Sequence, residues 1–440
     1  MLANLSPAIS ANAHNTRFHS DTVSSASQRL QKQFGLLLSA CLVALCILYS
    51  QSAQANKFER GGLQSVKVGE ADLYPALRID YYQNDNAFLT PENQIESGEI
   101  VVKPSVDFVA DRRLFKFEAG YSGAYQSADE EALNYNDHAL YARTEAALST
   151  KKRVSAALNI GLSHEELGQN LTRGNANRDT KLVNHGTTQF EGRYTYGAEA
   201  AKGNVSFGMR LRDFRYTSRS DITDGRDNRY LEPFAAFSYR VGGDTRATVE
   251  LRFRNQDFSN GARNRYDYTA LFGLNFAATG KSGGQIALGS SFSDYRSSGV
   301  SNTSEIVIEG ALFWEPTTFS RFDLSVNRFL NSESGALVSF DTPSAVNDTV
   351  DLSWRHSWSD RVSHTATMGF SNVSTVCPNR DSQSVSGKFE LDFKIRRWVG
   401  IGFLAASDSV VVDECMDPDN PDVDLDNDRT RLGVYLRAHL

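Results

Sequence analysis

The densest set of candidate metal ligands in this chain is a run of aspartates near its end. Asp422, Asp424, Asp426 and Asp428 recur at every second residue. This spacing resembles the start of a calcium loop, where alternate carboxylates converge on a hard cation. However, Asn427 stands where such a loop needs glycine, and no glutamate occupies the twelfth position. The pattern therefore leaves open a structural Ca²⁺ site or a solvated acidic loop, and no other cofactor is expected.

Patterns of catalytic residues are weaker than this pattern of metal ligands. The stretch His164-Glu165-Glu166 lacks the second histidine that a helical zinc-protease motif needs. Asp137-His138 and nearby serines offer part of a hydrolase triad, but no third member is identifiable. We predict no catalytic residues and no enzymatic activity.

The elements that must position these residues are strands. From Arg431 to Leu440, apolar residues at even positions alternate with polar or small residues at odd positions. A period of two indicates a strand with one apolar and one polar face. Similar segments recur back to about residue 72. Such strands belong either to a soluble sheet or to a transmembrane barrel, which turns the apolar face toward lipid.

The N-terminal region indicates export. Arg29 and Lys32 precede an apolar run from Phe34 to Tyr49, and the run ends at Ala53-Gln54-Ala55. A basic flank, a short apolar core and an A-x-A site predict a signal peptide. We expect residues 1–55 to be an extended leader and cleaved signal peptide, 56–71 a short periplasmic segment, and 72–440 the barrel.

Cysteine usage agrees with an exported chain. Cys41 and Cys46 fall in the predicted signal peptide, which leaves Cys377 and Cys415 in the mature part. Both lie in predicted long loops on the same side of the barrel. Because two cysteines in an oxidising compartment most often pair, we expect a structural disulfide between them.

Turn and loop signals alternate along the mature region. Short turns are predicted at Asp111-Arg112, Lys151-Lys152, Lys202-Gly203, Gly242-Gly243, Gly280-Lys281, Glu315-Pro316, Ser359-Asp360 and Arg396-Arg397. Longer polar loops are predicted near 84–97, 126–136, 166–186, 217–228, 257–266, 296–303, 331–347, 373–383 and 412–429. These connections predict an all-β, antiparallel outer-membrane barrel of about 18 strands, with short periplasmic turns and long extracellular loops. A soluble propeller is disfavoured because no repeat of fixed length is present.

The polar faces of these strands would line the lumen. The pore-lining residues predicted by alternation are Arg143, Glu145, Glu191, Arg193, Arg210, Arg212, Glu250, Arg252, Arg254, Arg321, Asp323, Lys388, Glu390 and Asp392. Tyr141 and Tyr239 are also expected to point inward. The basic residues on the middle hairpins either steer an anionic solute or polymer, or pair with acids on neighbouring strands and stiffen the wall. The formal net charge of -7 gives no reason to expect nucleic acid as a partner.

Short motifs open the predicted barrel. They are Leu73-Tyr74-Pro75, Gln83-Asn84-Asp85-Asn86, Lys103-Pro104-Ser105-Val106 and Tyr135-Asn136-Asp137-His138. Their order resembles that of a β-barrel porin family found with bacterial exopolysaccharide gene clusters, most clearly over residues 72–145. The turn Gln83-Asn84-Asp85-Asn86 departs slightly from the family's "YNDN"-like form. The resemblance implies an outer-membrane barrel that serves synthesis, export or surface attachment of a polysaccharide, and it supplies no catalytic residues.

Two functions remain open. The first is export or surface handling of an exopolysaccharide together with periplasmic export components. The second is a general or substrate-specific diffusion porin for small hydrophilic solutes. In either case the expected location is the bacterial outer membrane, with membrane lipids and lipopolysaccharide as neighbours.

Overall fold

The computed structural model describes residues 65–166, 181–261, 263–297, 301–331, 345–375, 380–414 and 426–439. All of them belong to one compact unit, Ala53–Leu440. The predicted signal peptide lies outside the described residues, so its cleavage stays a prediction. Among the described residues, no helix has the length and hydropathy needed to cross a membrane.

Within these described ranges, nineteen strands form one antiparallel sheet. The first half comprises β1 (Val66–Val68), β2 (Ala71–Asn84), β3 (Ser97–Arg112), β4 (Phe115–Ala128), β5 (Tyr135–Ser149), β6 (Lys152–Glu165), β7 (Val183–Tyr196), β8 (Gly203–Tyr216) and β9 (Asn228–Gly242). The second half comprises β10 (Thr245–Phe258), β11 (Arg265–Thr279), β12 (Ser282–Tyr295), β13 (Thr303–Thr317), β14 (Ser320–Asn331), β15 (Ala345–Ser357), β16 (Val362–Thr375), β17 (Arg380–Lys394), β18 (Val399–Glu414) and β19 (Asn427–His439). Short helical turns η1 (Glu131–Leu133) and α2 (Ser220–Thr223) lie in two connections.

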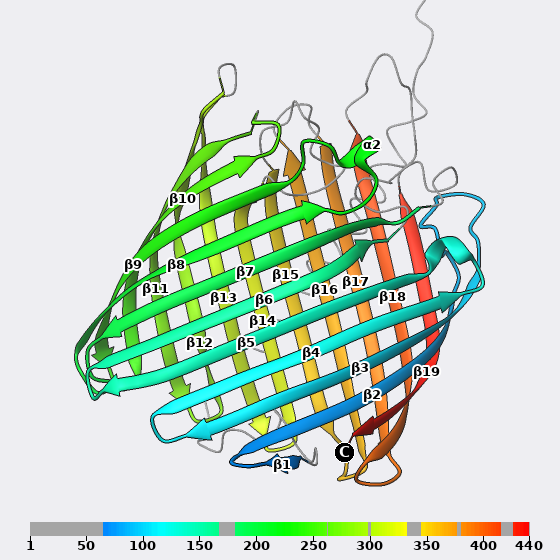
Figure 1. Cartoon of the computed structure of the whole chain (residues 1–440), viewed down its shortest axis with the longest axis horizontal. Coiled ribbons are helices and arrows are strands. Elements are labelled where there is room, and N and C mark those ends of the chain that lie inside the picture. Colours follow the sequence, from blue (N-terminus) through cyan, green and yellow to red (C-terminus); the bar gives the residue numbers. More distant parts are fainter. Residues whose placement is uncertain are drawn as a thin grey trace, which may run out of the picture. The chain divides into compact units, whose positions relative to one another are not determined.

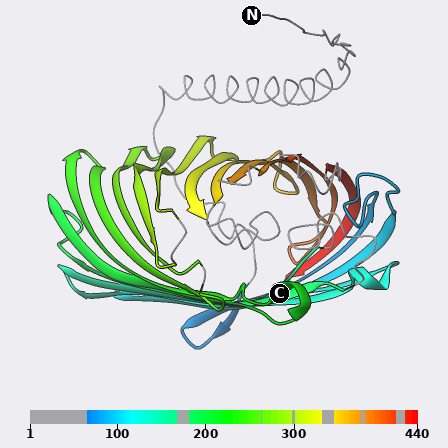
Figure 2. The ribbon, with the colours of Figure 1, turned by 90° about the horizontal axis from the view of Figure 1, so that it is seen from above.

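The sheet closes on itself. Each strand from β2 to β18 pairs with its successor, and β19 pairs with β2 from Arg431↔Asn84 to His439↔Ala76. Figure 1 shows β2 and β19, the two ends of the barrel sequence, side by side, and Figure 2 shows the ring of strands from above. The prediction of an 18-stranded antiparallel barrel is confirmed. Closure leaves no edge strand in the barrel, because every backbone ladder finds a partner.

The motif at the end of β2 fastens this seam. Asp85 and Thr430 exchange two hydrogen bonds, one between their backbones and one from the Thr430 N–H to the Asp85 carboxylate. Asn86 is fully buried, and its side-chain amide donates to the carbonyls of Thr90 and Asp428. Its side-chain oxygen accepts from the Thr90 N–H. The Asn-Asp-Asn run is therefore a structural clasp between the first and last barrel strands.

Period-two alternation gives the barrel two distinct faces. Apolar side chains such as Phe207, Leu251 and Leu288 project from the outer face and are largely exposed in the isolated chain. Register carries the same alternation from strand to strand, since directly opposed residues share a face. The outer face is the surface that lipid covers in a membrane barrel.

The connections separate into two ends. Eight turns of two to six residues lie at one end, here named the turn end, and nine connections that are mostly longer, from four residues upward, join the strands at the other, the loop end. Figure 1 shows α2 at the loop end and the C-terminus at the turn end. The turn predicted at Glu315-Pro316 lies instead at 318–319, because β13 continues through Pro316 to Thr317. Proline is tolerated near a strand end, where its missing N–H costs no ladder bond.

The sequence did not predict β1. It lies within the segment expected to precede the barrel and pairs with the start of β2 through Val66↔Leu73, Lys67↔Asp72 and Val68↔Ala71. An ion pair of 2.8 Å between Lys67 and Asp72 accompanies this pairing.

Aromatic rings gather on the outer face near the turn end. Trp314, Phe322 and Trp354 form a continuous stack, with ring centroids 5.3 and 5.6 Å apart. The Trp358 indole donates to His364 over 2.9 Å. Such rings suit a membrane–water interface, where an apolar body meets a polar edge.

Candidate functional site

The fourteen residues predicted to line the pore share one face of the barrel, opposite the apolar outer face. The register aligns them across neighbouring strands, as in Glu191↔Arg210 and Arg321↔Arg355. Two contacts identify this face as the concave one. Arg252 of β10 lies 2.5 Å from Glu309 of β13, and Arg78 of β2 lies 2.8 Å from Glu390 of β17. Neighbouring strands are about 4.8 Å apart, so contacts over three strands require side chains that converge inside the barrel.

A ladder of ion pairs runs along the inner face from β7 to β10. Arg210 lies 3.2 Å from Glu191 on one neighbouring strand and 2.7 Å from Glu232 on the other. Glu232 also accepts from Arg254 over 2.8 Å, and its side chain is almost fully buried. Arg193 completes the ladder through a longer contact of 3.5 Å to Glu191.

The ladder continues to β13. Arg252 lies 2.6 Å from Glu250 on its own strand and contacts Glu309 through both terminal nitrogens. Bidentate contacts of this kind are strong and fix the guanidinium plane. Of the two sequence-based interpretations of the basic residues, cross-strand pairing describes this part of the wall.

Aromatic rings support the arginines. The guanidinium carbons of Arg193 and Arg210 each lie 4.7 Å from the centre of the Phe234 ring. Phe234 in turn covers Gly208, where an added Cβ would clash with the ring. Arg212 lies over Phe214 at 5.3 Å, and Arg143 lies over Tyr141 at 5.4 Å. Cation–π contacts hold the long arginine side chains against the wall.

A second charged cluster lies near the closing seam. Arg78 bonds Asp80 over 2.6 Å as well as Glu390, and its guanidinium lies 3.8 Å from the Tyr435 ring centre. Lys103 also pairs with Asp80, at 2.9 Å. Two more predicted residues belong to this cluster, since Lys388 pairs with Glu390 and Asp392 pairs with Arg437. Glu145 lies elsewhere, on β5 opposite Lys116.

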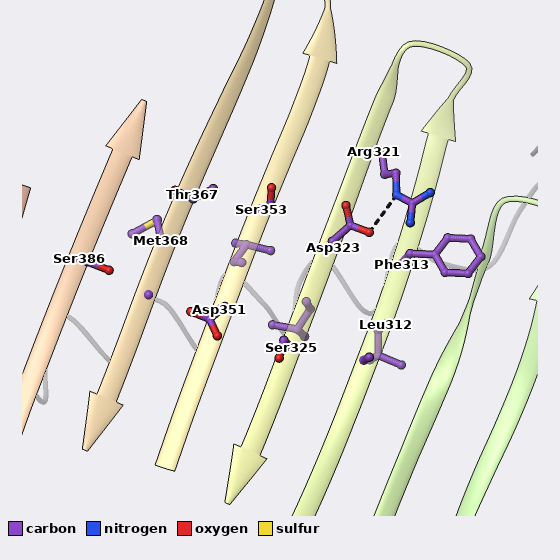
Figure 3. A pocket seen from close by; sticks show the side chains of 14 residues that line it. Leu312, Phe313, Arg321, Asp323, Ser325, Asp351, Ser353, Thr367, Met368 and Ser386 are labelled. Atoms are coloured by element: carbon purple, nitrogen blue, oxygen red, sulfur yellow. Dashed lines mark hydrogen bonds and ion pairs between the residues drawn. The ribbon is translucent and has the colours of Figure 1, made fainter. Parts of the chain in front are cut away.

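Between these clusters the wall is hollowed. A cavity of about 440 Å³ extends over β13 to β17. Figure 3 shows Arg321 and Asp323 joined at its edge, with Ser325 further along the same strand and Asp351 and Ser353 on the adjoining strand β15. An added Cβ at Gly369 would come within 2.6 Å of the Ser386 hydroxyl. The glycine therefore keeps this hollow open, and hydroxyls and carboxylates line it together with Leu, Phe and Met side chains.

One contact crosses the interior. Glu166 directly follows β6 and lies 2.6 Å from Arg429 of β19, although β2 to β5 separate these strands in the sheet. Arg429 also pairs with Asp408 at 2.9 Å. Burial disfavours the charged form of Glu166, but attraction to Arg429 and Arg431 outweighs it and lowers the pKa of this carboxyl. The connection after β6 thus begins inside the barrel, which alternation alone did not indicate.

One sequence expectation needs correction, and one weak pattern is found not to form a unit. Tyr239 points outward, because it lies in the same row as exposed Phe237 and Val241 and opposite Ala247. Its ring makes it a lipid-interface residue. The stretch Asp137-His138 does not act as a unit: Asp137 contacts His164 at 2.9 Å, whereas His138 contacts the hydroxyl of Tyr121 at 3.0 Å.

The metal and disulfide predictions fall mainly beyond the part of the chain that is described. Cys377, Cys415, Asp422 and Asp424 all lie outside it. The carboxylate of Asp426 accepts a hydrogen bond from the Val412 N–H, and the Asp428 carbonyl accepts from Asn86. Within the described ranges, no group of three or more His, Cys, Asp or Glu is placed to hold a metal ion. The Ca²⁺ site and the disulfide stay predictions.

Comparison with known proteins adds one family and several solved structures. A family model described as "Putative beta-barrel porin 2" matches residues 62–438. OpdO from Pseudomonas aeruginosa is 12% identical, with 84% of this chain and 97% of that chain covered at a TM-score of 0.42. The outer membrane protein OpdK from the same organism is 13% identical, with 84% and 99% covered at 0.41. The siderophore receptor PirA from Acinetobacter baumannii is 8% identical, with 84% and 80% covered at 0.40. No curated protein matches the sequence.

Proposed function

The chain belongs to the family described as "Putative beta-barrel porin 2", and from this premise we propose that it takes part in the export or surface handling of an exopolysaccharide. It is a β-barrel of the bacterial outer membrane, and membrane lipids surround its apolar outer face. The proposal concerns what passes through the barrel and which components act with it.

The observation that carries the proposal is the lining of the barrel. Ion pairs and aromatic rings occur on the inner face, with the charged ladder on β7 to β13, a second charged cluster at the seam, and the hollow with its hydroxyls on β13 to β17. A polysaccharide presents hydroxyls along its whole length and exchanges hydrogen bonds with such a wall at many weak sites. Passage requires contacts that are favourable enough for entry and weak enough for release.

Paired charges suit this role better than isolated ones. Arg210, Glu232 and Arg254 satisfy each other, so a moving chain need not displace a tightly held counterion. Periplasmic components of polysaccharide export are proposed as partners at the turn end, which is the periplasmic end in barrels of this pattern.

The second candidate is a diffusion porin for small hydrophilic solutes. It is favoured by the contact between Glu166 and Arg429, since a connection that begins inside the barrel narrows the passage. Small solutes tolerate a narrow passage, whereas a polymer needs a continuous wide one.

A clean deletion in the native host separates the two. Surface and secreted polysaccharide would be scored beside the uptake of small solutes, with the wild-type gene restored as control. Polysaccharide that is lost or trapped in the periplasm, with normal uptake, supports export. Normal polysaccharide with slower uptake of a solute contradicts export and supports the porin.

A further inference from the structure

The two ends of the barrel carry opposite charge. The eight turns contain seven basic residues, Arg113, Lys151, Lys202, Lys281, Arg361, Arg396 and Arg397, against three acidic ones. The nine connections at the loop end contain eighteen acidic and seven basic residues. The contrast is distributed over most connections, so it does not depend on one acidic loop.

The inner face repeats the contrast independently. Among side chains that point inward from the three residues of each strand nearest the turn end, eight are basic and four acidic. Arg153, Arg246, Arg355 and Lys394 belong to this inner group. At the loop end, the corresponding described side chains are five acidic, including Glu99, Asp267 and Glu305, and two basic.

Most of the basic turn residues are available to a ligand. Lys151, Lys202, Arg361, Arg396 and Arg397 are all exposed. Together with the inward-pointing arginines they form a basic collar around the turn end. A mouth with a net excess of one sign of charge raises the local concentration of the opposite ion, and the effect grows with each charge on a polymer.

We propose that the basic collar is an entry site for an anionic polysaccharide, one that carries carboxylate or similar groups, and that the polymer enters from the periplasm. This inference rests on the proposed export function and names its substrate class. An anionic polymer is attracted at the turn end and repelled by the acidic loop end after it emerges. The same charges disfavour uptake of anions from outside, because the acidic end faces them first.

The proposal is tested by current block in planar bilayers that hold the barrel in one orientation. Oligogalacturonate and neutral dextran oligomers of matched length are added in turn to each side. We expect half-block by oligogalacturonate at a concentration about tenfold lower from the turn end than from the loop end. Dextran should show no such asymmetry. Salt at about 1 M should abolish the effect, since it shortens the screening length to about 3 Å.

A collar variant tests whether the basic turn residues cause the asymmetric block by oligogalacturonate. It combines Lys151→Gln, Lys202→Gln, Arg361→Gln, Arg396→Gln and Arg397→Gln, all in exposed turns. We expect it to lose the asymmetry. The control variant, Lys181→Gln with Arg229→Gln, removes basic residues near the loop end and should keep it. Unchanged conductance without oligomer shows that each variant has folded.

Equal block by oligogalacturonate and dextran, or asymmetry that survives in the collar variant, would overturn the proposal. If the asymmetry is absent but a deletion strain still loses polysaccharide, export stands and its substrate is not anionic. If the collar binds oligogalacturonate but the deletion strain secretes normally, the proposed export function fails. If an acidic protein but no oligogalacturonate binds the collar, it is a docking surface and the proposal is wrong.

Discussion

The carboxylate of Glu166 lies 2.6 Å from the guanidinium of Arg429, and four strands of the sheet separate their elements. This contact joins the end of β6 to the start of β19 through the interior. Among the described residues, it places a carboxylate that follows β6 against an arginine of β19 inside the barrel.

Replacing Glu166 by glutamine should release this contact. The amide keeps the shape of the side chain but loses the charge that attracts Arg429 and Arg431. We expect a higher single-channel conductance in planar bilayers. Glu130→Gln, an exposed loop substitution, is the control. Equal conductance of the wild type and both variants would show that the contact does not narrow the passage.

Protonation of Glu166 should raise the single-channel conductance in the same way, but only at low pH. The folded-state pKa of Glu166 lies below its ordinary value of 4.5, so its contribution is complete above that value and is lost as pH falls further. The groups that face it are Arg429, Arg431, Asp408, Glu99, Tyr135 and His164.

Conductance should therefore stay constant from about pH 8 to pH 5 and approach that of Glu166→Gln only below about 4.5. A transition near neutral pH in the wild type but not in the variant would contradict the assignment.

Loss of Glu232 should weaken the ladder. Its nearly buried carboxylate joins Arg210 and Arg254, so Glu232→Gln leaves two guanidinium groups without their shared partner. We expect the free energy of unfolding to fall by about 2–3 kcal/mol in urea titrations in lipid vesicles. The exposed control Glu131→Gln should change it by less than about 0.5 kcal/mol. Equal values for both variants would mean that the ladder adds no stability.

Removing the clasp at the seam should also lower the free energy of unfolding. Asn86→Ala removes three hydrogen bonds and leaves the N–H and carbonyl of buried Thr90, and the carbonyl of Asp428, without that partner. The expected loss is about 1–3 kcal/mol in the same titration. Asn136→Ala, at an exposed position, should be neutral. A neutral Asn86→Ala would remove the clasp as an explanation for the motif.

A charged residue on the outer face should destabilise the barrel in a membrane. Leu251 is 57% exposed in the isolated chain and lies in the middle of β10 between Val249 and Phe253. Leu251→Arg should cost about 2–4 kcal/mol in vesicles, because the guanidinium would face the bilayer core. Thr367→Arg projects into the inner hollow and should cost less. A larger loss of stability for Thr367→Arg than for Leu251→Arg would show that the two faces are assigned the wrong way round.

Alternation by itself determined most of the barrel. Period two in stretches such as Phe389 to Ile395 assigns both strand and face. The regular alternation of short turns and polar loops predicted the number of strands. It also placed Arg210, Arg252 and Glu390 on the polar face, since side-chain direction is a local property of an extended backbone. Tyr239 was misassigned because tyrosine suits both an aqueous lumen and a lipid interface.

Only the tertiary structure decided what depends on closure. The contacts Arg78–Glu390, Arg252–Glu309 and Glu166–Arg429 join positions 57 to 312 residues apart. They exist because curvature and strand tilt bring distant side chains together on the concave face. Local sequence specifies which way a side chain points, whereas its partner depends on the path of the whole ring.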